Sequence, residues 1–80
     1  MNTRECVVKR LEELCAQRNL SFRKLASISG VSASTVISIF NGASQHPGVV
    51  TLKKLCDGLD ITLIEFFDTE DFRNLEQEIK

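Results

Sequence analysis

The fold is decided by residues 21–42, which read SFRKLASISGVSASTVISIFNG. The stretch divides into two segments of helix-forming length, residues 22–29 and 33–40, and a serine stands directly before each segment. A serine hydroxyl is a favourable N-cap because it accepts a hydrogen bond from a free backbone N–H of the first turn. Gly30 is suited to end the first segment, since glycine adopts the left-handed conformation of a helix C-terminus without steric penalty. Two short helices joined so closely must turn sharply, which predicts a helix-turn-helix.

A longer helix is predicted before this stretch, over residues 3–18. Starting at Val7, four apolar residues recur at i, i+4, i+7 and i+8, which places them on one face of a helix. Charged residues cover the opposite face. Asn2 or Thr3 can cap the start of this helix, and Asn19 is suited to end it. The segment therefore predicts an amphipathic helix.

Two further helices are predicted after the loop that holds the chain's only proline. The first spans about residues 51–58, and Gly58 is expected to close it. Thr62 and Glu65 then form a capping box, in which the hydroxyl and the carboxylate each satisfy a free backbone N–H. This motif opens a short helix that ends near Phe67. Because no segment alternates in the manner of a strand and no repeat occurs, the predicted fold class is all-α, a compact five-helix bundle.

The last segment, residues 69–80, is polar and acidic and reads as a tail to a domain at residues 1–68. Phe72, Leu75 and Ile79 recur at i, i+3 and i+7 and form an apolar stripe that is too small for an independent helix. The stripe either folds back on the bundle or pairs with a second chain, and we favour a role in self-association. A disordered acidic tail is the third interpretation. The predicted organisation is one domain followed by a short helical or disordered tail.

Charge is distributed unevenly along the chain, although the formal net charge is only −1. Residues 1–56 carry eight basic and three acidic side chains, whereas residues 57–80 carry two basic and eight acidic ones. Such asymmetry is typical of a basic working part followed by an acidic tail. The alternative, that these are ordinary solvated faces, explains the charges equally well.

Composition excludes several classes of protein. No run of about 18 apolar residues is present, and the N-terminus lacks the apolar segment of a secretory signal, so a cytoplasmic location without a membrane span is expected. The cysteines Cys6, Cys15 and Cys56 form no C-x-x-C pair, and one histidine cannot complete a metal site, so reduced structural thiols and no cofactor are expected. Because no carboxylate pair, nucleophile–base pair or glycine-rich phosphate loop occurs, the chain is predicted not to be an enzyme.

The helix predicted at residues 33–40 has two distinct faces. Val36, Ile39 and Phe40 fall at i, i+3 and i+4 and can seal the helix onto its neighbours. The opposite face carries Ser34, Ile37, Ser38 and Asn41. A solvated helix face usually carries Glu and Lys, whereas this face is small and uncharged. Because short side chains let a helix backbone approach base edges in the major groove of DNA, the pattern indicates a helix that reads DNA.

The same residues carry a family resemblance. Residues 21–42 resemble the helix-turn-helix of the Cro/CI, or XRE, family. The matching positions are Leu25-Ala26, Gly30-Val31-Ser32, Ser34-Thr35-Val36, Ile39 and Asn41-Gly42. Residues 47–67 look like the fourth and fifth helices of small members, so the resemblance covers about residues 5–68. It implies a lambda-repressor-like five-helix bundle whose third helix enters the major groove. It also implies a small, repressor-like transcriptional regulator that binds double-stranded DNA sequence-specifically.

The resemblance and the spacing together indicate which residues contact DNA. Base contacts are expected from Ala33, Ser34, Thr35, Ile37 and Ser38. Backbone contacts are expected from Ser21, Phe22, Arg23, Lys24, Asn41 and Ser44. Family members commonly carry Gln where this chain has Phe22, which either packs as a hydrophobic lid or lies against a sugar, and we favour packing. Since residues 33–40 contain no Arg or Gln, sequence discrimination is expected to be modest or to depend on DNA shape.

Few phosphate contacts are predicted for one chain, so a monomer would bind DNA weakly and a homodimer on DNA is expected. No small-molecule ligand is evident. The alternative function is a protein-interaction module, such as an antitoxin or antirepressor, that uses the same fold. The near-neutral net charge and the lack of long polar side chains on the reading face favour this alternative. Fold by itself does not decide between the two functions.

Overall fold

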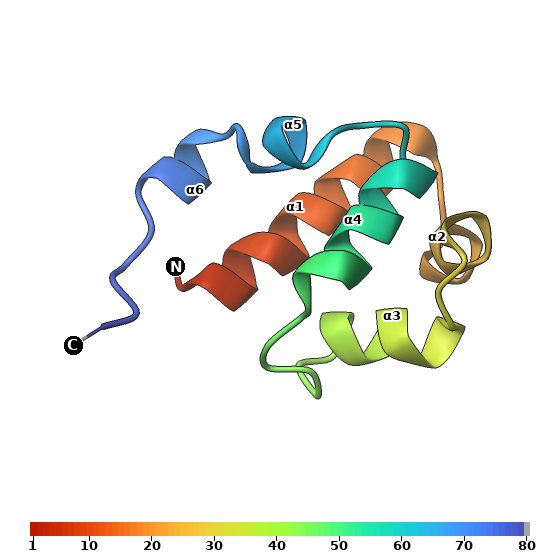
Figure 1. Cartoon of the computed structure of the whole chain (residues 1–80), viewed down its shortest axis with the longest axis horizontal. Helices are drawn as coiled ribbons and strands as arrows, with labels where there is room; N and C mark the ends of the chain where they lie inside the picture. The colour runs from red at the N-terminus through yellow and green to blue at the C-terminus, as the bar shows by residue number, and fades with distance from the viewer. Residues whose placement is uncertain (80) are drawn as a thin grey trace.

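The computed structural model describes residues 1–79, which form helices joined by short connections (Figure 1). The helices are α1 (Thr3–Arg18), α2 (Phe22–Ser29), α3 (Ala33–Phe40), α4 (Val49–Gly58), α5 (Leu63–Phe67) and α6 (Glu70–Arg73). The described residues contain no strand. The all-α prediction is therefore confirmed, with one short helix, α6, in addition to the five predicted.

The predicted helix boundaries differ from the structure mainly at the start of α4. The sequence places this start near Thr51, whereas α4 begins at Val49, directly after its N-cap residue Gly48. Val49 and Val50 are exposed, so the apolar spacing that indicates a helix starts only at Leu52. Gly48 also has no side chain with which to cap the helix. Both local signals of a helix start are therefore missing at this position.

Local capping explains where the first three helices begin and end. Asn2 and Glu5 form a capping box at α1. The Glu5 N–H donates to the Asn2 side chain at 2.8 Å, and the Asn2 N–H donates to the Glu5 side chain at 3.0 Å. The hydroxyls of Ser21 and Ser32 accept from backbone N–H groups at 3.1 and 3.2 Å, which caps α2 and α3. The left-handed residues that end α1 and α2 are Asn19, with a φ of 58°, and Gly30, with a φ of 67°.

The core is one apolar cluster to which α1, α2, α3, α4 and α5 all contribute. Each of these helices supplies at least one fully buried side chain, namely Leu11, Leu25, Val36, Leu55 and Phe66. α2 packs against both α3 and α4, α4 also packs against α5, and α6 lies on α1 (Figure 1). Burial of one such side chain stabilises the fold by about 1.5–3 kcal/mol. Tertiary packing of this kind is what stabilises helices as short as α2 and α3.

Gly58 allows α4 to approach α2 closely. A Cβ at this position would lie 2.1 Å from the Oγ of Ser29, 3.1 Å from its Cβ and 3.2 Å from its Cα. Gly58 is the last residue of α4, and the left-handed residue that follows is Asp60, with a φ of 59°. The predicted end of α4 at Gly58 is therefore confirmed, and the close packing against Ser29 is a second role of this glycine. The buried Ser29 hydroxyl has no hydrogen-bond partner among the described residues.

Aromatic residues bring the start of the acidic tail back onto the bundle. The ring of the buried Phe66 lies 5.0 Å from that of Phe67 and 5.9 Å from that of Phe72, measured between centroids. The first residue of the predicted apolar stripe, Phe72, thus folds back, whereas the last, Ile79, is 88% exposed. The boundary between a domain at residues 1–68 and a tail at residues 69–80 stays a prediction.

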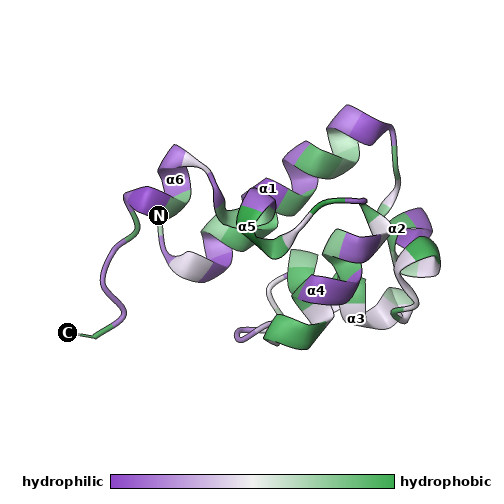
Figure 2. Cartoon of the chain, turned by 45° about the horizontal axis from the view of Figure 1, so that its top comes forward, coloured by the Kyte–Doolittle hydropathy of each residue, from purple (hydrophilic) through white to green (hydrophobic). Residues whose placement is uncertain are grey.

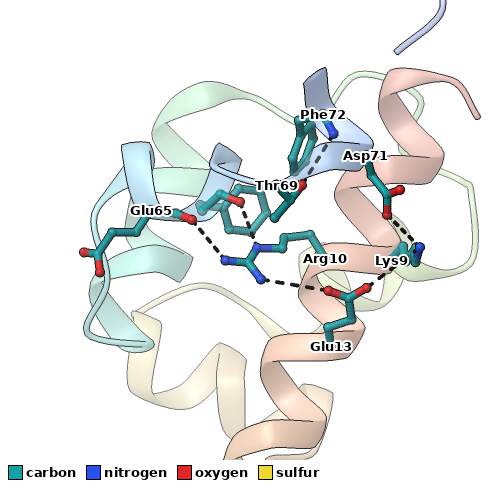
Figure 3. Close-up of polar contacts among 8 residues, drawn as sticks. Lys9, Arg10, Glu13, Glu65, Thr69, Asp71 and Phe72 are labelled. Carbon is teal, nitrogen blue, oxygen red and sulfur yellow. Dashed lines mark hydrogen bonds and ion pairs between the residues drawn. The ribbon is translucent and has the colours of Figure 1, made fainter. Parts of the chain in front are cut away.

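Two basic residues of α1 hold α5 and α6 in place (Figure 3). Arg10 donates from Nε to the Phe66 carbonyl at 2.8 Å and from Nη2 to the Glu65 carbonyl at 3.0 Å. Carbonyls at the end of a helix have no partner in a following turn, so Arg10 caps α5. Beside it, Lys9 donates to Asp71 at 2.6 Å, and this hydrogen bond raises the pKa of the Lys9 ammonium. Both side chains therefore contact residues far along the chain.

The three cysteines are part of the core. Cys6, Cys15 and Cys56 are buried and free, and burial raises the pKa of each thiol. Within residues 1–79, no group of three His, Cys, Asp or Glu side chains is placed to hold a metal ion. No helix in the same range is long and apolar enough to cross a membrane.

We expect Gly58→Ala to destabilise the fold by about 1–3 kcal/mol, because the added methyl group would overlap Ser29 and force α2 and α4 apart. Urea unfolding followed by circular dichroism measures the change. Gly48→Ala is the matched control, since a Cβ there meets Thr51 Oγ1 at 4.0 Å, and its effect should stay below about 1 kcal/mol. Equal stability of the Gly58→Ala variant and the wild type would contradict the close contact.

We expect Arg10→Ala to lower the free energy of unfolding by about 1–3 kcal/mol, because the Phe66 carbonyl loses its donor and the Glu65 carbonyl keeps only the longer bond of 3.4 Å from the Asp68 N–H. Arg18→Ala is the control, because Arg18 is exposed in the last turn of the same helix and has no side-chain partner in the described chain. Its loss should cost less than about 1 kcal/mol. Similar losses from both variants, measured by urea unfolding, would argue against the capping role.

We expect the thiols of Cys15 and Cys56 to react slowly with a disulfide reagent such as DTNB while the protein is folded. Only the thiolate attacks, and burial both shields these sulfurs and raises the pKa of each thiol. Absorbance of the released thiol measures the rate, and labelling in urea, where all three cysteines should react, supplies the reference. Equal rates with and without urea would show that the thiols are not protected.

Candidate nucleic-acid interface

α3 is anchored by one face and presents the other to solvent. Val36 and Ile39 lie in the core with almost no exposed surface. Of the residues predicted to contact bases, Ser34 and Thr35 are exposed. The half-buried residues of that set are Ala33, Ile37 and Ser38. In Figure 2, α3 shows none of the strong purple that marks charged residues on α1 and α4. The helix therefore presents a small, uncharged surface.

The exposed hydroxyls of α3 are gathered at its first turn. Ser32 Oγ lies 2.7 Å from Thr35 Oγ1 and 3.2 Å from Ser34 Oγ, so all three hydroxyls are within hydrogen-bond distance of a neighbour. A hydroxyl can donate and accept, and it rotates to suit its partner. The start of α3 can therefore offer either a donor or an acceptor to a ligand.

Phe22, at the start of α2, stacks on Phe40, at the end of α3. The ring centroids are 3.6 Å apart and the planes are inclined by 12°. The expected packing of Phe22 is therefore present, and it ties together the outer ends of the two helices of the helix-turn-helix. Phe22 remains 37% exposed, so part of the side chain faces solvent beside the cations that follow it.

Two cations lie at the start of α2. Arg23 and Lys24 are exposed, and neither forms an ion pair within the described part of the chain. Their position follows from the cap: the Ser21 hydroxyl accepts from the Lys24 N–H at 3.1 Å and fixes the first turn. Unpaired cations beside an uncharged helix face form a surface suited to a polyanion.

The loop after α3 folds tightly against the end of that helix. The Ser44 N–H donates to the Ser38 carbonyl at 2.9 Å, and the Ala43 N–H donates to the Asn41 side chain at 2.9 Å. The side chain of Gln45 donates to the Gly42 carbonyl. Asn41 is exposed and Ser44 is half-buried. The loop thus has a defined shape next to the outer face of α3.

The positive charge counted in the sequence is only partly accessible to a ligand. Lys9 pairs with Asp71 and Lys53 with Asp57, while Arg10 caps α5. Sequence reasoning could not separate Lys9 and Arg10 from Arg23 and Lys24. Three of the five contacts that Lys9 and Arg10 make in Figure 3 are with residues from distant parts of the chain.

Sequence reasoning also missed Arg4, on the first turn of α1. Its guanidinium Nη1 lies 3.7 Å from the position that a Cβ on Gly42 would occupy, so Arg4 reaches the loop after α3. Periodicity carries no signal for such a contact, because α1 and this loop are distant in sequence and meet only through the tertiary fold.

Comparisons with known proteins agree with this geometry. The family described as Cro/C1-type HTH DNA-binding domain matches residues 10–71. No curated protein sequence matches the chain. Among solved structures, prophage Lp1 protein 11 is 36% identical with a TM-score of 0.81, and the match covers 94% of this chain and 100% of that one. An HTH_3 family transcriptional regulator from Vibrio cholerae is 30% identical with a TM-score of 0.76, and the match covers 88% of this chain but 38% of that one. The chain belongs to the family of Cro/C1-type helix-turn-helix DNA-binding domains.

Proposed function

We propose that this protein is a small, repressor-like transcriptional regulator that binds double-stranded DNA sequence-specifically with α3 in the major groove. The exposed, uncharged face of α3, next to the unpaired cations Arg23 and Lys24, is the observation that carries the proposal. Membership of the Cro/C1-type family supports it, as does the likeness to a transcriptional regulator from Vibrio cholerae.

Affinity and sequence preference come from different parts of this surface. Arg23 and Lys24 neutralise backbone phosphates, which carry no sequence information, and they set the orientation of the protein on the duplex. Ser34 and Thr35 supply hydroxyls to base edges, and the methyl groups of Ile37 can contact thymine. Because none of these residues forms a bidentate contact with a base, DNA shape contributes to the preference.

Two copies of the chain on one DNA site follow from the small number of cations. Each phosphate contact contributes about 0.9 to the salt slope of binding, so one chain with a few contacts loses most of its affinity at physiological salt. A homodimer doubles the contacts and binds a site with two similar halves.

A protein-interaction module is the second candidate function. Ile64 on α5 is 82% exposed, and Val49 and Val50 at the start of α4 are 63% and 66% exposed. Contiguous apolar patches mark places where one protein contacts another, and Val49 and Val50 are adjacent in the chain. If this second function holds, α3 keeps its shape because it packs on the core, and the protein has little affinity for DNA.

We expect the double variant Arg23→Glu and Lys24→Glu to weaken binding to all duplexes alike, with a Kd about tenfold higher or more and a salt slope smaller by about 2. Fluorescence anisotropy with a mixed-sequence duplex at low salt measures both. Lys54→Glu is the control, because Lys54 is an exposed, unpaired cation on α4. No salt-sensitive binding by the wild type would favour the protein-interaction module.

We expect Ser34→Glu to abolish preference for fragments that the wild type selects from genomic DNA, because an acid on α3 meets base edges and flanking phosphates. Ser27→Glu adds the same charge to an exposed position on α2 and should keep the preference. Anisotropy with selected and scrambled duplexes gives the ratio of the two Kd values. A ratio that stays at the wild-type value in the Ser34→Glu variant would remove α3 from the base-reading role.

A further inference from the structure

A groove of about 440 Å³ lies between the start of α1, the loop after α3 and the acidic tail, and apolar side chains that include Leu52 of α4 and Phe67 of α5 line part of it. Arg4 lines it from α1, Gln45 and His46 line it from the loop, and Glu78 lines it from the tail. None of these residues belongs to the two short helices on which the proposed function depends. The groove therefore brings together three segments that the helix-turn-helix leaves unused.

Arg4 is the cation of this groove. It is half-buried, and its Nη1 lies 3.7 Å from the position of a Cβ on Gly42, so the side chain extends from α1 to the loop. Within residues 1–79 the guanidinium has no ion-pair or hydrogen-bond partner. A guanidinium carries five N–H donors in a planar fork that matches a phosphate group. An unpaired guanidinium in a groove is thus suited to an oxyanion.

The groove continues the surface of α3. The hydrogen bond of 2.9 Å from the Ser44 N–H to the Ser38 carbonyl fixes the loop to the end of the helix. α3 has eight residues, so it is about 12 Å long, close to the width of the major groove of B-DNA. If α3 lies across the major groove, the loop at its C-terminal end comes near a sugar-phosphate backbone, and Arg4 reaches that loop from α1.

A carboxylate of the tail, that of Glu78, lies at the edge of the same groove. Glu78 accepts from Thr3 Oγ1 at 2.8 Å and from the Thr3 N–H at 3.5 Å, at the first residue of α1. The negative charge of Glu78 lowers the electrostatic potential in the groove and disfavours a second anion there.

We propose that this groove is a phosphate site that extends the DNA interface beyond the helix-turn-helix, with Arg4 as its cation and Glu78 as a carboxylate at its edge that weakens phosphate binding by repulsion. The proposal rests on the proposed function, because the phosphate belongs to the duplex that α3 contacts. In the free protein the tail carboxylate lies at one edge of the groove. When DNA binds, a backbone phosphate pairs with Arg4, and repulsion between that phosphate and Glu78 reduces the affinity.

Arg4→Gln tests the cation, with Lys54→Gln as the control for loss of one exposed positive charge. Anisotropy with a mixed-sequence duplex should give a Kd about tenfold higher for Arg4→Gln and a salt slope smaller by about 1. Lys54→Gln should change the Kd less than about twofold. Since Arg4 has no partner in the described chain, the fold should keep its stability in urea. If both variants bind like the wild type, Arg4 contacts no phosphate and the proposal is overturned.

Glu78→Gln tests the repulsion, because the amide keeps a hydrogen-bond acceptor for Thr3 and removes the charge. The Kd for DNA should fall about two- to threefold, whereas Glu12→Gln, which removes an exposed carboxylate from α1, should leave the Kd within error. Equal effects of the two variants would refute a local repulsion by Glu78 and leave only an effect of net charge. Lack of DNA binding by the wild type would defeat the proposed function instead, so the two failures are distinguishable.

Discussion

Burial of Val36 and Ile39 is the contact on which the exposed surface of α3 depends. These two side chains attach α3 to the common core, in which α2 and α4 also take part. Because α3 has only eight residues, it has little stability as an isolated helix, and this apolar contact supplies it. The same contact determines the rotation of the helix about its axis. Ser34 and Thr35 face solvent because Val36 and Ile39 cannot.

The close packing of α2 against α4 also helps to fix the orientation of α3. Gly58 lets the two helices meet at Ser29, and the stacked rings of Phe22 and Phe40 join the outer ends of α2 and α3. The angle between the start of α2, where Arg23 and Lys24 lie, and the exposed face of α3 is therefore set by packing on both sides. A rigid angle of this kind is what a groove of fixed width requires.

Basic and acidic residues are less separated in the folded molecule than the charge count along the chain implies. Lys9 and Arg10 lie in the basic half of the sequence, yet they bind Asp71 and the end of α5. Residues of the predicted acidic tail also contact the bundle, because Phe72 lies near Phe66 and Glu78 accepts a hydrogen bond at the start of α1. The surface of α3 is consequently suited to a polyanion mainly because α3 carries no carboxylate, and less because cations surround it.

The sequence by itself determined the class of the fold, the bounds of most helices and the two faces of α3, since caps and apolar spacing act over three or four residues. It could also indicate Phe22 as a packing residue. Only the tertiary structure decided the close packing at Gly58, the start of α4, and which cations stay unpaired. Arg10 meets Phe66 across 56 positions, and Arg4 meets Gly42. Contacts between such distant residues depend on how the helices pack, and no local pattern carries that information.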